Sequence, residues 1–339
     1  MKQIFTIVMI LALAASCSKD VVISKVESTP IAFSNVFIDK STKAATDISY
    51  GNSLAVALEK FNIYGIVTGD ADPINIYDGD EVTGTVGGDW SCDDTQYWVD
   101  KCSYDFIALV DATASKDITV TSGGTSTSVT ARNTVSTDAD GMPTAITYDV
   151  RTQKDVLIAT AERDLDVETP SYAPVQLTFR HLLSKVVFTF TNAFAQTSGV
   201  ELTVKDIQIT ARQSAVYTIG GASAGWSKPG QNEAKAQVKF GNTETISPGG
   251  DYAECGNVAL LIPGDYTNLH IAFVVEHNKG GNPTPLTADI DVTLLEGNSY
   301  NLTAELNSAN VSGVLPIRFV IKEDTGWEAT GDKDVDYRE

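Results

Sequence analysis

The sequence predicts an all-β protein built of antiparallel β-sandwiches, for three reasons. Short runs in which apolar and polar residues alternate recur along most of the chain, and this alternation places one face of each strand in a core. Segments rich in Gly, Ser, Thr and Asp separate the runs, as turns between short strands require. Helical periodicity is almost absent. Because 339 residues exceed the usual size of one core, we expect two domains.

The N-terminal end of the chain resembles a bacterial lipoprotein signal. Lys2 supplies a positive charge, residues 4–15 form an apolar run too short to span a bilayer comfortably, and small residues precede Cys17. In such signals the cysteine is acylated, for example with palmitate, and becomes the first residue of the mature chain. We therefore expect a signal peptide at residues 1–16 and lipidation of Cys17. An ordinary secretory peptide is the alternative.

A polar tether leads to the first predicted strand, at residues 31–38. Its apolar residues fall in two opposite phases, so we expect a bulge near Ser34 and Asn35 that reconciles them. These apolar residues are Ile31, Phe33, Val36 and Ile38. The residues that follow are small and polar and include Lys40 and Lys43. This composition predicts an exposed loop, the kind of segment that proteases cut most readily.

The rest of the first half combines clear strands with long polar segments. Alternation predicts four strands, at residues 61–68, 104–110, 146–150 and 156–159. Residues 70–89 and 121–144 are rich in Gly, Asp, Ser and Thr. We interpret both segments as loops, with at most one short strand at residues 83–86.

Residues 175–191 hold the most regular alternation of the chain. Val175, Leu177 and Phe179 share one face of a first arm, and a second arm repeats the pattern from Val186 onward. The few residues between the arms are enough for one turn. We interpret the stretch as two strands joined by a turn, and as the junction of the two domains.

The second half repeats this organisation. A strand at residues 200–209 contains Asp206 in an otherwise alternating run, which predicts a kink there. The remaining predicted strands lie at residues 216–219, 238–240, 258–262, 269–276, 286–294, 300–306 and 317–321. Strands of this length and spacing are typical of antiparallel sandwiches.

The charge balance excludes some classes of partner. The chain has 24 basic and 44 acidic residues, which gives a net charge of −20. A surface of this kind repels nucleic acid and anionic lipid headgroups. We therefore expect no nucleic-acid partner, and the balance fits an exported protein.

Three cysteines follow Cys17. Cys92 and Cys102 lie ten positions apart, a spacing that a hairpin could bring together. In an exported protein a disulfide between them and two free thiols both remain open. Cys255 is left over, and we interpret it as a small buried residue. None of these cysteines has the spacing of a zinc site.

The sequence offers little support for an enzyme. We expect His181, in the central turn, to have a hydrogen-bonded structural role, and His270 and His277 would face opposite sides of a shared strand. The sequence has no metalloprotease helix, nucleophile elbow or phosphate-binding glycine loop. Asp138 and Asp140 resemble part of a calcium loop without its later bidentate acid. We expect no catalytic residue, metal or cofactor.

Three aromatic residues near Cys92 have two interpretations. Trp90, Tyr97 and Trp98 could stack on a sugar ring. A position in a core or a hairpin is favoured, because large aromatic side chains supply much of the buried area of a core.

Several segments, in this order along the chain, resemble the fimbrillin (Mfa-like, FimA-type) proteins of Bacteroides and its relatives. They are the lipoprotein leader, FNIYGIV, YWVDKCSYDFIALV, FRHLLSKVVFTF, EGNSYNLTAEL and DTGW. The resemblance implies two antiparallel Greek-key (transthyretin-like) β-sandwich domains in tandem, which we place at residues 44–175 and 176–339. It also implies a pilin that reaches the outer membrane as a lipoprotein and ends in a fimbrium on the cell surface.

The resemblance further implies activation by proteolysis. In this family a trypsin-like protease removes the first strand by cutting after a basic residue, and the vacated groove accepts a strand from a neighbouring pilin. Residues 17–43 would then be the tether and removable strand, cut between Lys43 and Ala44, with Lys40 as the competing site. Both lysines could instead be ordinary solvated loop residues.

Two functions remain open from the sequence. The tail after Trp327 is short and acidic and lacks the alternation of a donor strand. This favours a tip or accessory pilin, which would bind a ligand on a host or bacterial surface, over a repeated stalk subunit. The alternative is a monomeric outer-membrane lipoprotein that binds glycans. Residues 17–43 are removed in the first case and retained in the second.

Overall fold

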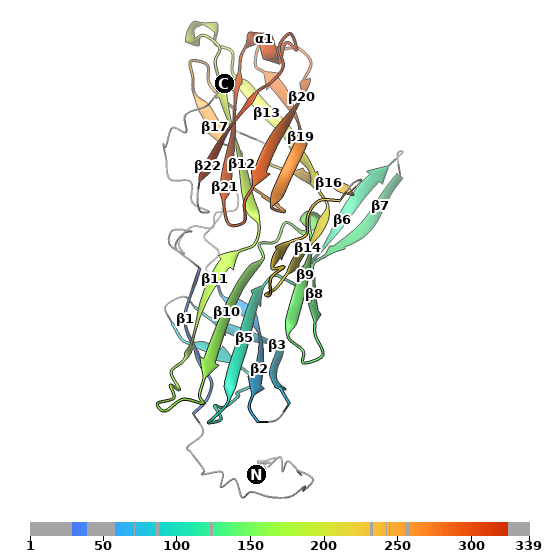
Figure 1. The fold of residues 1–339 in the computed structure, drawn as a ribbon. Helices are drawn as coiled ribbons and strands as arrows, with labels where there is room; N and C mark the ends of the chain where they lie inside the picture. The colour runs from blue at the N-terminus through green and yellow to red at the C-terminus, as the bar shows by residue number, and fades with distance from the viewer. Residues whose placement is uncertain are drawn as a thin grey trace, which may run out of the picture.

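The protein is all-β in the part of the chain that the structure describes (Figure 1). The computed structural model describes residues 29–38, 58–70, 72–85, 88–122, 125–230, 233–241, 243, 245–254 and 258–324. The regular elements of these residues are strands, apart from the short helix α1 (Ser308–Val311) and the 3-10 turns η1 (Val150–Thr152) and η2 (Gln196–Ser198). The predicted all-β class is confirmed, but not every strand pair is antiparallel, because β1 (Phe33–Ile38) pairs in parallel with β11 (Val175–His181), and β12 (Ser184–Asn192) with β21 (Ser299–Leu306).

Seven strands form one closed barrel, in the lower part of Figure 1. In spatial order they are β1 (Phe33–Ile38), β11 (Val175–His181), β10 (Leu157–Asp164), β5 (Ser103–Val110), β2 (Lys60–Thr68), β3 (Ile74–Gly84) and β4 (Trp90–Cys92). Their inward side chains form a core rich in aromatic rings, since Phe61, Tyr77, Phe106 and Phe179 are each at most 1% exposed. The strands predicted at residues 61–68, 104–110 and 156–159 lie in this barrel.

Two further sheets pack face to face in the upper part of Figure 1. One has the order β17 (Tyr252–Glu254), β12 (Ser184–Asn192), β21 (Ser299–Leu306) and β22 (Phe319–Asp324), with β18 (Ala259–Leu261) also paired to β12. The other has the order β16 (Lys235–Lys239), β13 (Leu202–Arg212), β19 (Gly264–His277) and β20 (Thr284–Leu294). The ring centroids of Phe190 and Phe273 lie 5.1 Å apart, so the apolar faces of the two sheets share one core.

A third sheet joins segments from the two halves of the chain. Its order is β15 (Gly225–Trp226), β14 (Ser214–Thr218), β9 (Pro143–Asp149) and β8 (Thr134–Thr137). Ala215 of β14 lies opposite Tyr148 of β9, and both Tyr148 and Tyr217 pack against the ring of Trp226. Alternation predicted strands near β9 and β14 but carries no information on which strands pair.

The prediction that residues 70–89 and 121–144 are loops is wrong. β3 crosses the first segment, and the second contains β8 and β7 (Thr125–Arg132), which pairs with β6 (Ser115–Ser122) in a hairpin that projects from the body (Figure 1). Two register shifts against β2 interrupt the alternation of β3. The described side chains of the hairpin are mostly exposed on both faces, so no apolar stripe marks its strands.

The central stretch passes from the barrel into the upper sheets. Its two predicted strands are confirmed as β11 and β12, and the change of sheet falls at Leu182 and Leu183. The carbonyl of Leu182 accepts a hydrogen bond from Nε1 of Trp226 at 2.7 Å, and that of Leu183 accepts one from the amide of Gly297 at 2.9 Å. Both leucines are fully buried. The crossover is therefore fixed by partners from β15 and from the turn before β21.

β13 bends where the sequence predicted a kink. Asp206 has a φ of +53°, and the register against β19 shifts between Lys205 and Gln208. A residue in the left-handed region inside such a bulge bends the strand. The kink at Asp206 is confirmed.

Candidate functional site

β1 is the strand that closes the barrel. It pairs in parallel with β11, from Phe33 opposite Val175 to Ile38 opposite Phe179, and Phe33 also lies opposite Trp90 of β4. β1 thus lies between the two ends of a sheet that otherwise runs without a break from β11 to β4. A barrel without β1 would have two open sheet edges, and open edges pair readily with another chain.

The apolar side chains of the predicted first strand point into the barrel core. Ile31, Phe33 and Val36 are 6%, 4% and 1% exposed. Between Ser34 and Phe37 the register against β11 shifts, which confirms the irregularity expected in this part of the strand. The shift lets residues in two opposite phases share one buried face.

Phe33 is the centre of an aromatic cluster. Its ring centroid lies 5.9 Å from those of Phe61 and Tyr77 and 6.3 Å from that of Phe106. With about 1.5–3 kcal/mol for each fully buried side chain, the three described apolar residues of this strand contribute roughly 5–9 kcal/mol. A whole domain is stable by only about 5–15 kcal/mol. Loss of β1 would therefore remove a large part of the barrel's stability.

The backbone just before β1 is bonded on both sides. The amide of Ile31 donates to the carbonyl of Gln96 at 2.8 Å, and the carbonyl of Ala32 accepts from the amide of Val175 at 2.7 Å. These bonds join the segment to two different parts of the barrel wall. Removal of the segment would leave unpaired backbone groups on both walls.

The groove that β1 fills is therefore apolar along its floor and polar along its two edges. Phe61, Tyr77 and Phe106 line the floor. Burial raises the pKa of Tyr77, so its hydroxyl remains neutral and adds no charge to the groove. A groove of this kind fits an extended segment, whose backbone pairs with the edges while alternate apolar side chains enter the floor.

Several residues predicted for this site lie outside the described residues. They are Cys17, Lys40, Lys43, Ala44 and the side chain of Ile38. Cys255 also lies outside them. Their roles stay predictions.

The disulfide considered for Cys92 and Cys102 is not formed in the structure, where both are free thiols. Val82 of β3 lies opposite Phe61 of β2 on one side and Cys92 of β4 on the other, so Cys92 is level with the beginning of β2. Cys102 lies beside Gly69, just beyond the other end of β2. The length of this nine-residue strand, roughly 26 Å at about 3.3 Å per residue, far exceeds the separation of about 7 Å at which two Cα atoms can be bridged.

Two of the histidines have carboxylate partners. Nδ1 of the buried His181 lies 2.7 Å from Oδ2 of Asp155, and that of the partly exposed His270 lies 2.8 Å from Oδ1 of Asp289. Among the described residues, no group of three or more His, Cys, Asp or Glu side chains could hold a metal ion. In the part of the chain that the structure describes, no helix is long and apolar enough to cross a membrane.

The aromatic residues weighed as a sugar platform divide between core and surface. Trp90 and Trp98 are buried, and the ring of Trp98 packs at 4.8 Å on Tyr104. Tyr97 is 49% exposed. The three side chains therefore do not form one exposed platform.

Sequence reasoning missed most of the groove lining. Tyr77 fell in a segment predicted as a loop, and Phe61 and Phe106 were recognised as strand residues without their partner in β1. The clustering of aromatic residues at alternate positions of neighbouring strands was the available signal. It could not be used without knowing which strands are neighbours.

The comparisons with known proteins agree on the type of fold. A family model described as fimbrillin-like matches residues 42–322. A fimbrial protein from Bacteroides vulgatus ATCC 8482 is similar in structure, with a TM-score of 0.55 and 11% identity over 88% of this chain and 99% of that chain. A protein from Bacteroides ovatus ATCC 8483 has a TM-score of 0.50 and 12% identity over 90% and 99%. No curated protein sequence matches the chain.

Proposed function

Because the chain belongs to the fimbrillin-like family, whose model matches residues 42–322, we propose that it is a non-catalytic subunit of a surface fimbria that contributes to adhesion. In this proposal the subunit joins its neighbours by strand addition. One observation carries the proposal: β1 closes the barrel and fills an apolar groove with Ile31, Phe33 and Val36. A strand from a second subunit could replace it without any other change of topology.

Proteolysis is the step that would open the groove. A cut between Lys43 and Ala44, or after Lys40, separates β1 from the strands that follow it in sequence. Thr29 to Ile38 would then be held only by non-covalent contacts and could exchange with a strand from another subunit. Before the cut, β1 fills its own groove and the subunit stays a monomer.

The proposal also includes a lipid anchor for the uncut chain and a position for the subunit in the fibre. Removal of residues 1–16 and acylation of Cys17 would hold the uncut chain at the outer membrane. For two tandem Greek-key domains we keep the proposed limits at residues 44–175 and 176–339, except that β11 belongs with the barrel, so that the first domain continues to the crossover at Leu182 and Leu183. The subunit would act at the tip or as an accessory pilin, with other pilins as partners and without a cofactor.

The double variant Lys40→Ala/Lys43→Ala tests the proposal. Native trypsin treatment of the wild-type protein should give a form that begins at Ala44 and assembles, whereas the double variant should stay uncut and monomeric. Mass spectrometry of the N-terminus and light scattering measure the two steps. Lys116→Ala, at an exposed position of β6, is the control and should behave as wild type.

Assembly of the uncut double variant as efficient as that of the wild type would reject the strand as the switch. A mature chain from cells that still carries residues 17–43 would instead support the monomeric glycan-binding lipoprotein.

A further inference from the structure

The barrel wall beside β1 contains three buried polar groups that have no hydrogen-bond partner. They are Nε1 of Trp90, Nε1 of Trp98 and the hydroxyl of Tyr77, which are enclosed and form no hydrogen bond within the described residues. The three side chains are 5%, 6% and 1% exposed. An enclosed polar group without a partner costs free energy, so native structures contain few of them. Three in one wall therefore indicate that a partner is missing.

All three residues lie beside the segment of residues 29–38. Trp90 lies directly opposite Phe33 in the sheet, and the ring centroid of Tyr77 lies 5.9 Å from that of Phe33. The amide of Trp98 donates a hydrogen bond to the carbonyl of Thr29 at 3.0 Å. A strand that takes the place of β1 would therefore meet the same three polar groups.

Ile31 occupies the position closest to two of these groups. Its amide donates to the carbonyl of Gln96 at 2.8 Å, in an antiparallel arrangement with the facing segment. Trp98 lies two residues further along that segment and on the same side, so Ile31 and Trp98 are diagonal neighbours, a relation that long side chains can bridge. The hydroxyl of Tyr77 lies beside the backbone of Gln96, but the two do not meet in a hydrogen bond.

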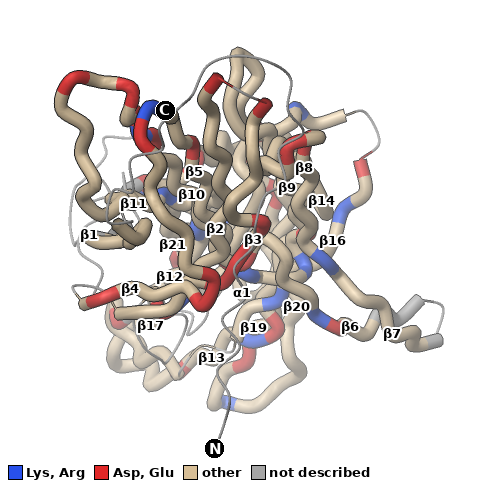
Figure 2. The backbone as a smooth tube through the Cα atoms, turned by 90° about the horizontal axis from the view of Figure 1, so that it is seen from below, with Lys and Arg blue, Asp and Glu red and all other residues tan. Residues whose placement is uncertain are grey.

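The segment that fills the groove supplies no acceptor to this wall. Its buried described side chains are Ile31, Phe33 and Val36, which carry neither oxygen nor nitrogen. No residue from 29 to 38 is charged, and Figure 2 accordingly shows β1 without a charged position. β1 thus fills the groove by shape and leaves the polar groups of the wall unpaired.

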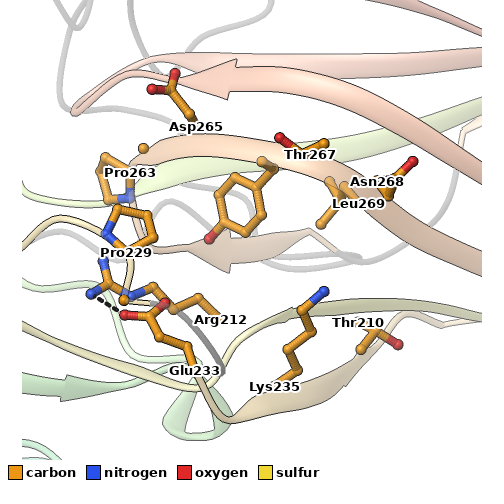
Figure 3. A pocket seen from close by; sticks show the side chains of 13 residues that line it. Thr210, Arg212, Pro229, Glu233, Lys235, Pro263, Asp265, Thr267, Asn268 and Leu269 are labelled. Carbon is orange, nitrogen blue, oxygen red and sulfur yellow. Dashed lines mark ion pairs between the residues drawn. The ribbon is translucent and has the colours of Figure 1, made fainter.

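The upper sheets contain a buried polar group that is satisfied in the usual way. Nε of Arg212 has no partner among the described residues, but its Nη1 donates to the carbonyl of Ser227 at 2.7 Å, and its Nη2 pairs with Glu233 at 2.7 Å (Figure 3). An indole has only one polar atom. Nothing else in the side chains of Trp90 and Trp98 can therefore compensate for the unpaired N–H.

We propose that the strand that replaces β1 in the fibre carries an uncharged side chain with an acceptor oxygen, such as glutamine, at the position of Ile31. This inference rests on the proposed strand addition and adds to it the chemistry of the incoming strand. The oxygen accepts hydrogen bonds from Nε1 of Trp98 and the hydroxyl of Tyr77, while the positions of Phe33 and Val36 stay apolar. Because these donors are neutral, a charged side chain would be buried without a counter-charge. β1 is then the weaker occupant of the groove, which gives the exchange its direction.

Two substitutions in the uncut full-length chain test this inference without any assembly step. Glutamine and methionine have similar length and flexibility, but only glutamine supplies a strong acceptor. We expect the folding equilibrium constant of Ile31→Gln to be at least about threefold larger than that of Ile31→Met, measured by denaturant unfolding followed by circular dichroism. A groove that accepts only apolar side chains would favour methionine. An equal or smaller constant for Ile31→Gln would overturn the inference.

Trp98→Phe and Tyr77→Phe tie the effect to the two donors. Each removes one donor and keeps an aromatic ring, so the advantage of glutamine over methionine at position 31 should fall in each background. Because both residues are compared within one background, a general loss of stability cancels. Tyr148→Phe is the control, since it removes a buried hydroxyl from the core of the upper sheets, and it should leave the advantage unchanged. An undiminished advantage in Trp98→Phe or Tyr77→Phe would overturn the pairing with that donor.

The cut protein separates this inference from the proposed function. A peptide of residues 29–38 with Ile31→Gln should return the form that begins at Ala44 to a monomer at a concentration at least about threefold lower than the Ile31→Met peptide. Equal or weaker action of the glutamine peptide would overturn the inference and leave strand addition intact. A cut form that does not associate at all would reject strand addition and, with it, the incoming strand.

Discussion

At the scale of single residues, Phe33 shows how strongly one side chain holds β1 in place. Its ring is 4% exposed and packs edge-on against Phe61 and Phe106. Phe33→Ala removes the ring and leaves a cavity, so we expect the free energy of unfolding of the uncut barrel to fall by about 3–5 kcal/mol. Denaturant unfolding, followed by the fluorescence of the buried Trp90 and Trp98, measures the change.

Ser34→Ala is the matched control for this prediction. Ser34 is half-buried on the same strand, and its substitution should change the stability by less than about 1 kcal/mol. Equal unfolding midpoints for Phe33→Ala and Ser34→Ala would contradict the role of β1 as part of the core.

At the scale of elements, the sequence predicts the strands that have one buried face. β11 alternates between buried and exposed positions along its whole length, and this produces the regular pattern from which it was recognised. β3 was missed because its bulges interrupt the alternation, and the β6–β7 hairpin was missed because few of its side chains are buried. Alternation of apolar and polar residues indicates burial on one face of a strand. It therefore identifies neither strands with bulges nor strands exposed to solvent on both faces.

Of the candidate site, only the residues of β1 could be predicted from the sequence, and the residues of the groove that it fills could not. Ile31, Phe33 and Val36 alternate within a short local run, so their burial follows from the sequence. Phe61 and Tyr77 meet Phe33 through contacts between distant parts of the chain. Pairings of this kind depend on strand order, which local pattern does not encode.

The strand order also decides the state of the thiols of Cys92 and Cys102. Because Cys92 is level with the beginning of β2 and Cys102 lies just beyond its other end, we expect both to be free in the purified protein. Burial raises the pKa of both thiols, so they should react slowly in the native state. Alkylation in denaturant without reductant, followed by mass spectrometry, should modify both. Peptides joined by a Cys92–Cys102 bridge would contradict this placement.

At the scale of the whole molecule, the barrel that β1 closes is joined to a sandwich whose core contains none of the described residues of β1. The crossover at Leu182 and Leu183 is bonded to Trp226 and Gly297, which lie outside the barrel. Loss of β1 should therefore open the barrel and leave the upper sandwich folded.

This arrangement leads to a prediction about assembly and its inhibition. The form that begins at Ala44 should associate with itself or with partner pilins, because its empty groove and two open edges gain burial from any suitable strand. A synthetic peptide of residues 29–38 should refill the groove and return the protein to a monomer, as measured by light scattering after size-exclusion chromatography. The same peptide with Phe33→Asp and Val36→Asp should have no effect, because charged side chains cannot enter the apolar floor. A cut form that stays monomeric without peptide, or that both peptides affect equally, would show that the groove of β1 is not the site of assembly.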